Sequence, residues 1–214
     1  MITWAASDGR EEGGDRVVPA ASTIKIFVAS AFWRSVSQRG LDPAGRVEVP
    51  PAAWSVADRL AGPVTLADCA LLMLAFSDNA ATNVLLHLLG FDAVNEEAAR
   101  LGAERTQVRR LMMSAGRENL TSARDLARGL ASVDEERVFE ALALAQDSEL
   151  HFRLQGHEVL VKTGELWPLV YHEVALVDRK LAVAVCSQPA ALPHVVAATA
   201  ERVTGISLEK TGSP

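Results

Sequence analysis

The sequence predicts an α/β fold of the α+β type, in which an antiparallel sheet flanked by helices accompanies an all-helical part. Apolar helical segments follow one another between residues 22 and 156, and after Gly156 the hydrophobic period switches from helix to strand. The chain also starts on a short apolar strand and finishes on a helix. We therefore expect a helical domain over residues 22–156 and a discontinuous sheet domain made of residues 1–21 and 157–214.

The expected helices are marked by apolar periodicity and by their end signals. Residues 22–38 are apolar nearly all round, with Pro19 upstream and Gly40 just past the end, which predicts a central buried helix. Thr65 and Asp68 have the spacing of a capping box at the start of a second apolar helix. Helices are expected over residues 22–38, 65–76, 79–89, 91–101, 121–132 and 134–146.

The expected strands lie mainly in the last third of the chain. Residues 2–7 predict a short edge strand, and the Val- and Leu-rich segments 157–164, 170–177 and 180–187 predict an antiparallel sheet. Asp178 and Arg179 form the expected tight hairpin turn. A closing helix over residues 190–203 has Val195, Val196, Ala198 and Val203 as the apolar residues that would cover one sheet face.

Composition excludes several classes of function. The chain has 214 residues, 49% apolar and 22% charged, which excludes a disordered protein, and its formal charge of -6 disfavours nucleic acid or an anionic membrane as partner. No apolar run approaches the roughly 18 residues of a membrane span, and residues 1–8 lack the features of a signal peptide, so the compartment stays undecided. Cys69 and Cys186 lie in apolar segments and are expected to be core side chains.

Three short motifs carry the candidate chemistry. In chain order they are Ser22-Thr23-Ile24-Lys25, Ser77-Asp78-Asn79 and Lys162-Thr163-Gly164, the S-x-x-K, S-D-N and K-T-G set of serine hydrolases. Only four of the 21 basic residues are lysines, so arginine is the usual cation of this chain. Positions that have lysine are therefore candidates for a role that needs an amine able to lose its proton. A second K-T-G at residues 210–212 is set aside because no strand follows it.

The residues of these motifs suit nucleophilic catalysis. Ser22 and Lys25 are one helical turn apart, and burial in an apolar helix would lower the lysine pKa so that it could accept the serine proton. Ser77 would relay a proton to a leaving nitrogen, with Asn79 holding substrate or Lys25. Lys162 would bind Ser77 and make the site positive. The alternative readings are that Ser22 and Ser77 are ordinary helix caps and that Lys25 reaches water.

Together these motifs resemble the class A β-lactamases and their low-molecular-weight penicillin-binding relatives. The resemblance extends over most of the chain and implies the β-lactamase/transpeptidase-like fold, with the site in the cleft between the two domains. It implies an acyl-enzyme on Ser22, an oxyanion hole made by the backbone N–H groups of Ser22 and Glu165, no cofactor and no metal. Thr163 would bind a substrate carboxylate, and Gly164 would let substrate approach the backbone.

The sequence departs from the family pattern at the residue that hydrolyses the acyl-enzyme. Met112 stands where the family has a loop glutamate, and a thioether cannot activate water. Glu118 is the nearest carboxylate, although pairing with Arg110 or Arg117 is the more common role for such a residue. We therefore expect acylation to be retained and hydrolysis of the acyl-enzyme to be slow.

The substrate side of the site departs from the pattern as well. Glu165 follows the K-T-G motif where the family has a small residue, and Tyr171 stands near the place of an arginine. A carboxylate there would repel the acid group of penicillins, so the expected substrate carries an amine or lacks that acid. His172 is a further candidate for substrate contact, and its alternative is a structural histidine.

The sequence supports a small-molecule or peptide substrate and leaves three functions open. These are a β-lactamase-like serine hydrolase, a peptidase or esterase with little β-lactam turnover, and a penicillin-binding sensor that is acylated once. A helical interaction domain with accidental motifs is the alternative outside this chemistry. Family members are usually secreted or periplasmic, and they usually have a helix before the first strand that packs on the closing helix. Only 21 residues precede Ser22 here, so we expect an exposed apolar stripe on the closing helix, which marks either a homodimer contact or an incomplete N-terminus.

Overall fold

The computed structural model describes residues 1–145 and 147–206 and contains a five-stranded antiparallel sheet of order β2-β1-β9-β8-β7. Its strands are β1 (Ile2–Ala6), β2 (Glu11–Glu12), β7 (Val159–Leu166), β8 (Val170–Val177) and β9 (Leu181–Ser187). Two short pairs, β3 (Val18–Pro19) with β6 (Leu120–Thr121) and β4 (Arg46–Val47) with β5 (Val64–Thr65), lie outside it. The predicted α/β fold class is confirmed.

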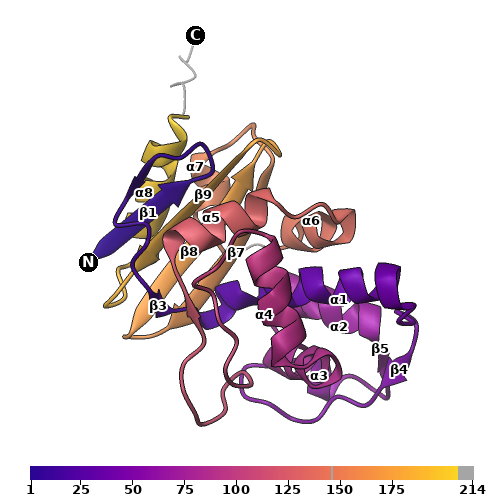
Figure 1. Cartoon of the computed structure of the whole chain (residues 1–214). Helices are drawn as coiled ribbons and strands as arrows, with labels where there is room; N and C mark the ends of the chain where they lie inside the picture. The colour runs from indigo at the N-terminus through magenta and orange to yellow at the C-terminus, as the bar shows by residue number, and fades with distance from the viewer. Residues whose placement is uncertain (146, 207–214) are drawn as a thin grey trace.

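The helices gather mostly on one side of the sheet (Figure 1). They are α1 (Lys25–Arg39), α2 (Leu66–Ala75), α3 (Asn79–Leu89), α4 (Phe91–Arg100), α5 (Ala123–Ala131), α6 (Glu136–Ala143), α7 (Leu150–Arg153) and α8 (Pro193–Thr204). Two short 3₁₀ helices, η1 (Ala21–Ile24) and η2 (Ala57–Arg59), complete the described elements.

Helices cover both faces of the sheet, which explains why every residue of β8 is buried. Side chains alternate between the faces of a strand, and α8 and α7 pack on the face that carries Val161 and Ala175. The other face carries Leu160 and Val174, and α5 and η1 pack on it. Because α5 lies within residues 22–156 yet packs on the sheet, the predicted division into two domains stays a prediction.

Helix α1 is the central helix that its all-round apolar sequence predicts. Ten of its residues are buried, and Gly40 ends it with a left-handed φ of 70°. A Cβ added at Gly129 of α5 would lie 2.4 Å from Cε1 of Phe27, so α5 and α1 approach more closely than a side chain would allow. The structure differs from the prediction at the start, because residues 21–24 form the 3₁₀ helix η1 instead of the first α-helical turn.

The other predicted elements are present with shifted boundaries. Thr65 and Asp68 form the expected capping box of α2, and the Asp178-Arg179 turn has the positive φ values of 48° and 55° that a tight hairpin needs. Strand β1 is not an edge strand, because β2 pairs with its outer side. The helix expected to start at residue 121 starts at Ala123, because Thr121 belongs to β6 and Ser122 is the N-cap of α5. Helix α7 was not predicted, because four residues carry too little periodicity.

The closing helix α8 buries most of its apolar side chains. The α8 residues Val196 and Val203 are buried, whereas Val195 of the same helix is 37% exposed. The predicted homodimer contact therefore rests on little exposed apolar surface of α8 and stays a prediction. Cys69 and Cys186 are buried in the core as expected. Within the described residues no helix is long and apolar enough to cross a membrane, and the second K-T-G lies outside them.

Candidate active site

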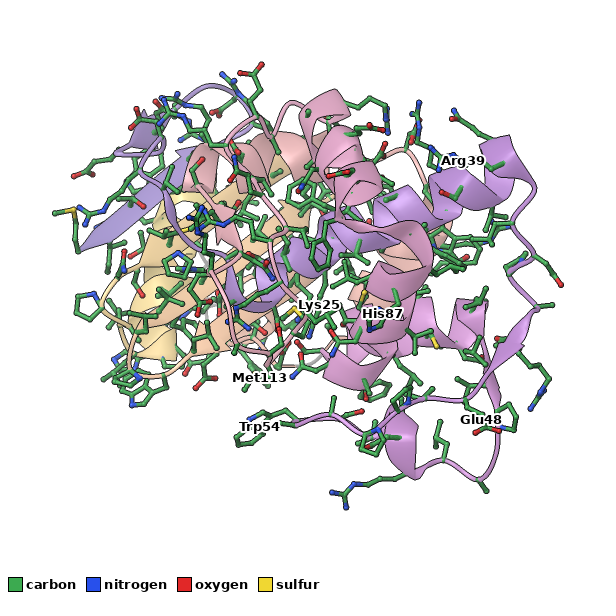
Figure 2. All side chains as sticks on the ribbon, turned by 60° about the horizontal axis from the view of Figure 1, so that its bottom comes forward. Lys25, Arg39, Glu48, Trp54, His87 and Met113 are labelled. Atoms are coloured by element: carbon green, nitrogen blue, oxygen red, sulfur yellow. The ribbon has the colours of Figure 1, made fainter. Side chains whose placement is uncertain are left out.

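A cavity of about 540 Å³ lies where η1, the loop before α3, the segment 110–119 and the end of β7 meet. It brings the three motifs together, because Ser22, Ser77, Asn79 and Thr163 all line it. In Figure 2, Lys25 lies in the interior between the sheet and the helices, and the cavity residues Trp54 and Met113 lie outward of it. The volume falls in the range of small-molecule sites.

Ser22 is held in a tight turn that is packed against β7. The preceding residue, Ala21, has a left-handed φ of 47°, and Thr23 anchors the turn through its hydroxyl to the Ala20 carbonyl oxygen at 2.6 Å. A Cβ on Gly164 would lie 3.0 Å from Thr23 N and 2.8 Å from its Cγ2. Gly164 therefore makes room for the turn that carries Ser22, and the expectation that it lets substrate approach the backbone stays a prediction.

Lys25 is fully buried and its Nζ contacts both candidate serines. The Nζ lies 3.0 Å from Ser22 Oγ, 2.6 Å from the Ser77 carbonyl oxygen, 2.8 Å from Asn79 Oδ1 and 3.2 Å from Ser77 Oγ. Burial, and secondarily the charge of Lys162, lower the Lys25 pKa well below its ordinary value. A neutral amine can donate to the Ser77 carbonyl and to Asn79, which leaves its lone pair for the Ser22 proton.

The Ser77-Asp78-Asn79 motif is built around the buried Asp78 carboxylate. It caps α3 by accepting from Ala81 N at 2.8 Å, and it also accepts from Val56 N at 2.7 Å, Ala57 N at 2.9 Å and Ser55 Oγ at 2.8 Å. Burial by itself raises the Asp78 pKa, but these hydrogen bonds outweigh it and lower the pKa overall. Ser77 has a left-handed φ of 54°, a conformation that this network maintains.

Asn79 joins the second motif to the first. Its Oδ1 accepts from Lys25, and its Nδ2 donates to the Ala53 carbonyl oxygen at 2.9 Å. The amide therefore fixes the direction of the lysine. Of the two predicted roles of Asn79, holding Lys25 is observed, and its place in the cavity lining leaves substrate contact as a prediction.

Lys162 is also fully buried, but its hydrogen bond differs from the predicted one. Its Nζ donates to the Thr163 carbonyl oxygen at 3.0 Å, whereas Ser77 Oγ lies within hydrogen-bond distance of Lys25. Desolvation lowers the Lys162 pKa to about 8, against an opposing effect of the Asp147 carboxylate. The ammonium is thus mostly charged at neutral pH and contributes positive charge near the cavity end of β7.

Two of the predicted substrate contacts lie away from the cavity. Tyr171 is buried under α7 and α8, one strand inward from the sheet edge, and its hydroxyl donates to Glu173 Oε1 at 2.9 Å. His172 is on the opposite face, where Nε2 lies 2.8 Å from the Pro19 carbonyl oxygen and Nδ1 accepts from Ser187 N at 3.2 Å. Both are structural residues. Glu165, by contrast, is exposed and lines the cavity as predicted.

Met112 lines the cavity at the position where the family pattern has a glutamate. Asn83 holds its backbone on both sides, since Asn83 Oδ1 accepts from Met112 N at 2.7 Å and Nδ2 donates to Met112 O at 3.2 Å. Glu118 forms an ion pair with Arg110 at 2.6 Å. Glu118, the nearest carboxylate to Met112 in the sequence, is therefore paired with arginine, as the alternative interpretation predicted.

Several cavity residues were not found from the sequence. Asp147 accepts a hydrogen bond from the Thr163 hydroxyl, and exposed apolar side chains of Trp54, Phe76 and Met113 stand at the rim. Asp147 follows a helix without any motif around it, and Trp54 lies in a segment without periodicity. Only the three-dimensional convergence of these loops on β7 reveals them.

The fold and the motif geometry agree with the comparisons. The sequence matches the family described as "Beta-lactamase enzyme family" over residues 7–206, and the chain therefore belongs to this family. Its fold is that of the class A β-lactamases, and family and fold together support a serine hydrolase of the class A β-lactamase kind. Comparison with curated proteins found no match.

Solved structures of β-lactamases superpose over nearly the whole chain. An ancestral class A β-lactamase has a TM-score of 0.85 at 20% identity, covering 96% of this chain and 94% of the other. A β-lactamase from Xanthomonas campestris has a TM-score of 0.85 at 17% identity, with 95% and 90% covered. One from Sphaerobacter thermophilus has a TM-score of 0.79 at 26% identity, with 95% and 88% covered.

We expect Asp78→Ala to destabilise the protein by about 3 kcal/mol at pH 7, because it removes a helix cap and leaves buried donors unpaired. Folding lowers the Asp78 pKa. The carboxylate therefore contributes fully to the free energy of unfolding at a pH above its ordinary pKa of 3.8, and this contribution is lost as the pH falls through its lower pKa in the folded state. Urea unfolding from pH 3 to 7 measures this.

Asp92→Ala, at an exposed position in the first turn of α4, is the matched control. We expect it to change the free energy of unfolding by less than about 0.5 kcal/mol. An Asp78→Ala protein as stable as wild type, or one whose deficit persists unchanged at the lowest pH, would contradict the structural role of this carboxylate.

Proposed function

We propose that this protein forms an acyl-enzyme on Ser22 with a β-lactam or a related amide, and that it hydrolyses this intermediate slowly. The observation that carries the proposal is the position of Lys25 Nζ, 3.0 Å from Ser22 Oγ and 3.2 Å from Ser77 Oγ inside one cavity. A buried amine between two hydroxyls suits a proton transfer from one to the other.

In the proposed acylation, Lys25 as a neutral amine accepts the Ser22 hydroxyl proton while Ser22 Oγ bonds to the carbonyl carbon. The backbone N–H groups of Ser22 and Glu165 stabilise the resulting oxyanion. The carbon–nitrogen bond then breaks, Ser77 gives its proton to the leaving nitrogen, and the Lys25 ammonium returns a proton to Ser77. The products are an ester on Ser22 and a neutral free amine, with Lys25 neutral again.

Deacylation requires a base that activates water, and the described residues around Met112 offer no unpaired carboxylate for that role. Met112 has no basic atom, and Glu118 is paired with Arg110. Asp147 is engaged by the Thr163 hydroxyl. This half of the site favours a long-lived acyl-enzyme, as in a penicillin-binding sensor, or a different natural amide or ester, over rapid β-lactam turnover.

Intact-mass spectrometry after addition of benzylpenicillin tests the proposal. We expect a lasting adduct with the mass of intact penicillin, absent in Ser22→Ala and unchanged in Ser37→Ala, an exposed serine outside the cavity. A transient adduct would indicate turnover, and rapid cleavage of a chromogenic cephalosporin would contradict slow deacylation. No adduct on a folded protein would point to a peptidase or esterase with another substrate.

The pH dependence of acylation should be bell-shaped. The rate should rise as Lys25, whose pKa is lowered by burial, loses its proton, and it should fall as Lys162 loses its charge above a pKa of about 8. Stopped-flow acylation across this range measures both limbs. Lys162→Arg should remove the descending limb because the guanidinium stays charged. A rate that keeps rising well above pH 8 in wild type would contradict this assignment.

Met112→Glu should restore hydrolysis of the acyl-enzyme. Asn83 holds the backbone of residue 112 in the cavity wall, so a carboxylate introduced there would face the acyl group and activate water. We expect the adduct lifetime to fall about a hundredfold, measured by time-resolved mass spectrometry. Met112→Gln, of similar size without a base, is the control, and equal lifetimes in the two variants would refute the missing-base explanation.

A further inference from the structure

The Thr163 hydroxyl lies at the end of the cavity at β7 and could bind an anion. The Lys162 ammonium is buried outside the lining, donates to the Thr163 carbonyl oxygen and adds positive charge near this end. A strand-end hydroxyl next to a buried positive charge is suited to a carboxylate. The sequence accordingly predicts that Thr163 binds the carboxylate of a substrate.

A carboxylate of the protein itself already occupies this position. The Thr163 hydroxyl donates a hydrogen bond to Asp147 Oδ2, and Asp147 lines the same cavity as Ser22 and Glu165. The charge of Asp147 reaches both buried lysines, since it raises the pKa of Lys162 and of Lys25 against their desolvation. Asp147 therefore both takes the hydroxyl donor and offsets part of the positive charge that an incoming anion would need.

The remaining charges near this end do not compensate for Asp147. Glu165, also in the lining, adds a second carboxylate, and Arg110, a cation of the lining, is paired with Glu118 at 2.6 Å. Like charges placed against each other repel, so a substrate acid is disfavoured here.

We propose that Asp147 is a specificity-determining residue that excludes a carboxylate from the Thr163 end of the cavity and selects substrates with an N–H donor, a carboxamide or an amine, at that position. Ionised carboxylate oxygens only accept hydrogen bonds, so the complementary group must donate. The inference rests on acylation of Ser22, the proposed function, and adds the substrate class of the same site.

Benzylpenicillin and its carboxamide form a matched pair of probes, because they differ only in the acid group. We expect the carboxamide to acylate wild type at least about tenfold faster than benzylpenicillin does. Second-order rate constants, measured by mass spectrometry, give this ratio. Asp147→Ala should raise the rate with the acid and reverse the preference. Asp147→Asn, which keeps the size of the side chain and removes its charge, should do the same if the alanine variant folds poorly.

Asp134→Ala makes the same change of net charge at an exposed position outside the cavity, and we expect it to leave the preference unchanged. A wild-type preference for the acid, or a ratio that Asp147→Ala and Asp147→Asn leave within about twofold of wild type, would overturn the inference while the proposed function stands. No adduct from either probe in any variant would overturn both.

Discussion

The burial of Lys25 is the interaction on which the rest of the site depends. Taking an ammonium fully out of water costs several kcal/mol unless its protons find partners, and here the partners come from the Ser22 turn and from the loop before α3. The lysine thereby ties two segments that are more than 50 residues apart in the chain. The left-handed backbone of Ser77 is explained in the same way, because that conformation directs the Ser77 carbonyl at the lysine.

Two buried lysines in one site repel each other, and nearby carboxylates offset part of this repulsion. The charge of Lys162 lowers the Lys25 pKa, while Asp78 and Asp147 raise it. Of these two acids, Asp78 is committed to backbone donors and holds the loop, whereas Asp147 reaches the cavity. The residues proposed for acylation thus lie together in one cavity, and the Met112 thioether lines the same cavity where the proposed hydrolysis would need a base.

Much of this structure could be predicted from local patterns, and the errors have a common cause. The capping box at Thr65, the turn at Asp178 and the glycine end of α1 are signals contained in a few neighbouring residues, and all are present. Tyr171 was expected at the cavity because it stands near the place of a family arginine, and His172 because it lies on the strand next to the K-T-G strand. Which side of the sheet a residue faces, and what covers it, depends on α7, α8 and the turn at Pro19, and no local pattern specifies these.

The sequence by itself determined the family, the α/β class and the identity of the four residues proposed for chemistry, Ser22, Lys25, Ser77 and Lys162, because a buried reactive group needs particular residue types at fixed local spacings. The tertiary structure alone decided which lysine contacts the serines, why Gly164 must lack a side chain and that Asp147 lies against Thr163. Those facts arise where separate loops converge, and the relative placement of such loops follows from the packing of the whole chain.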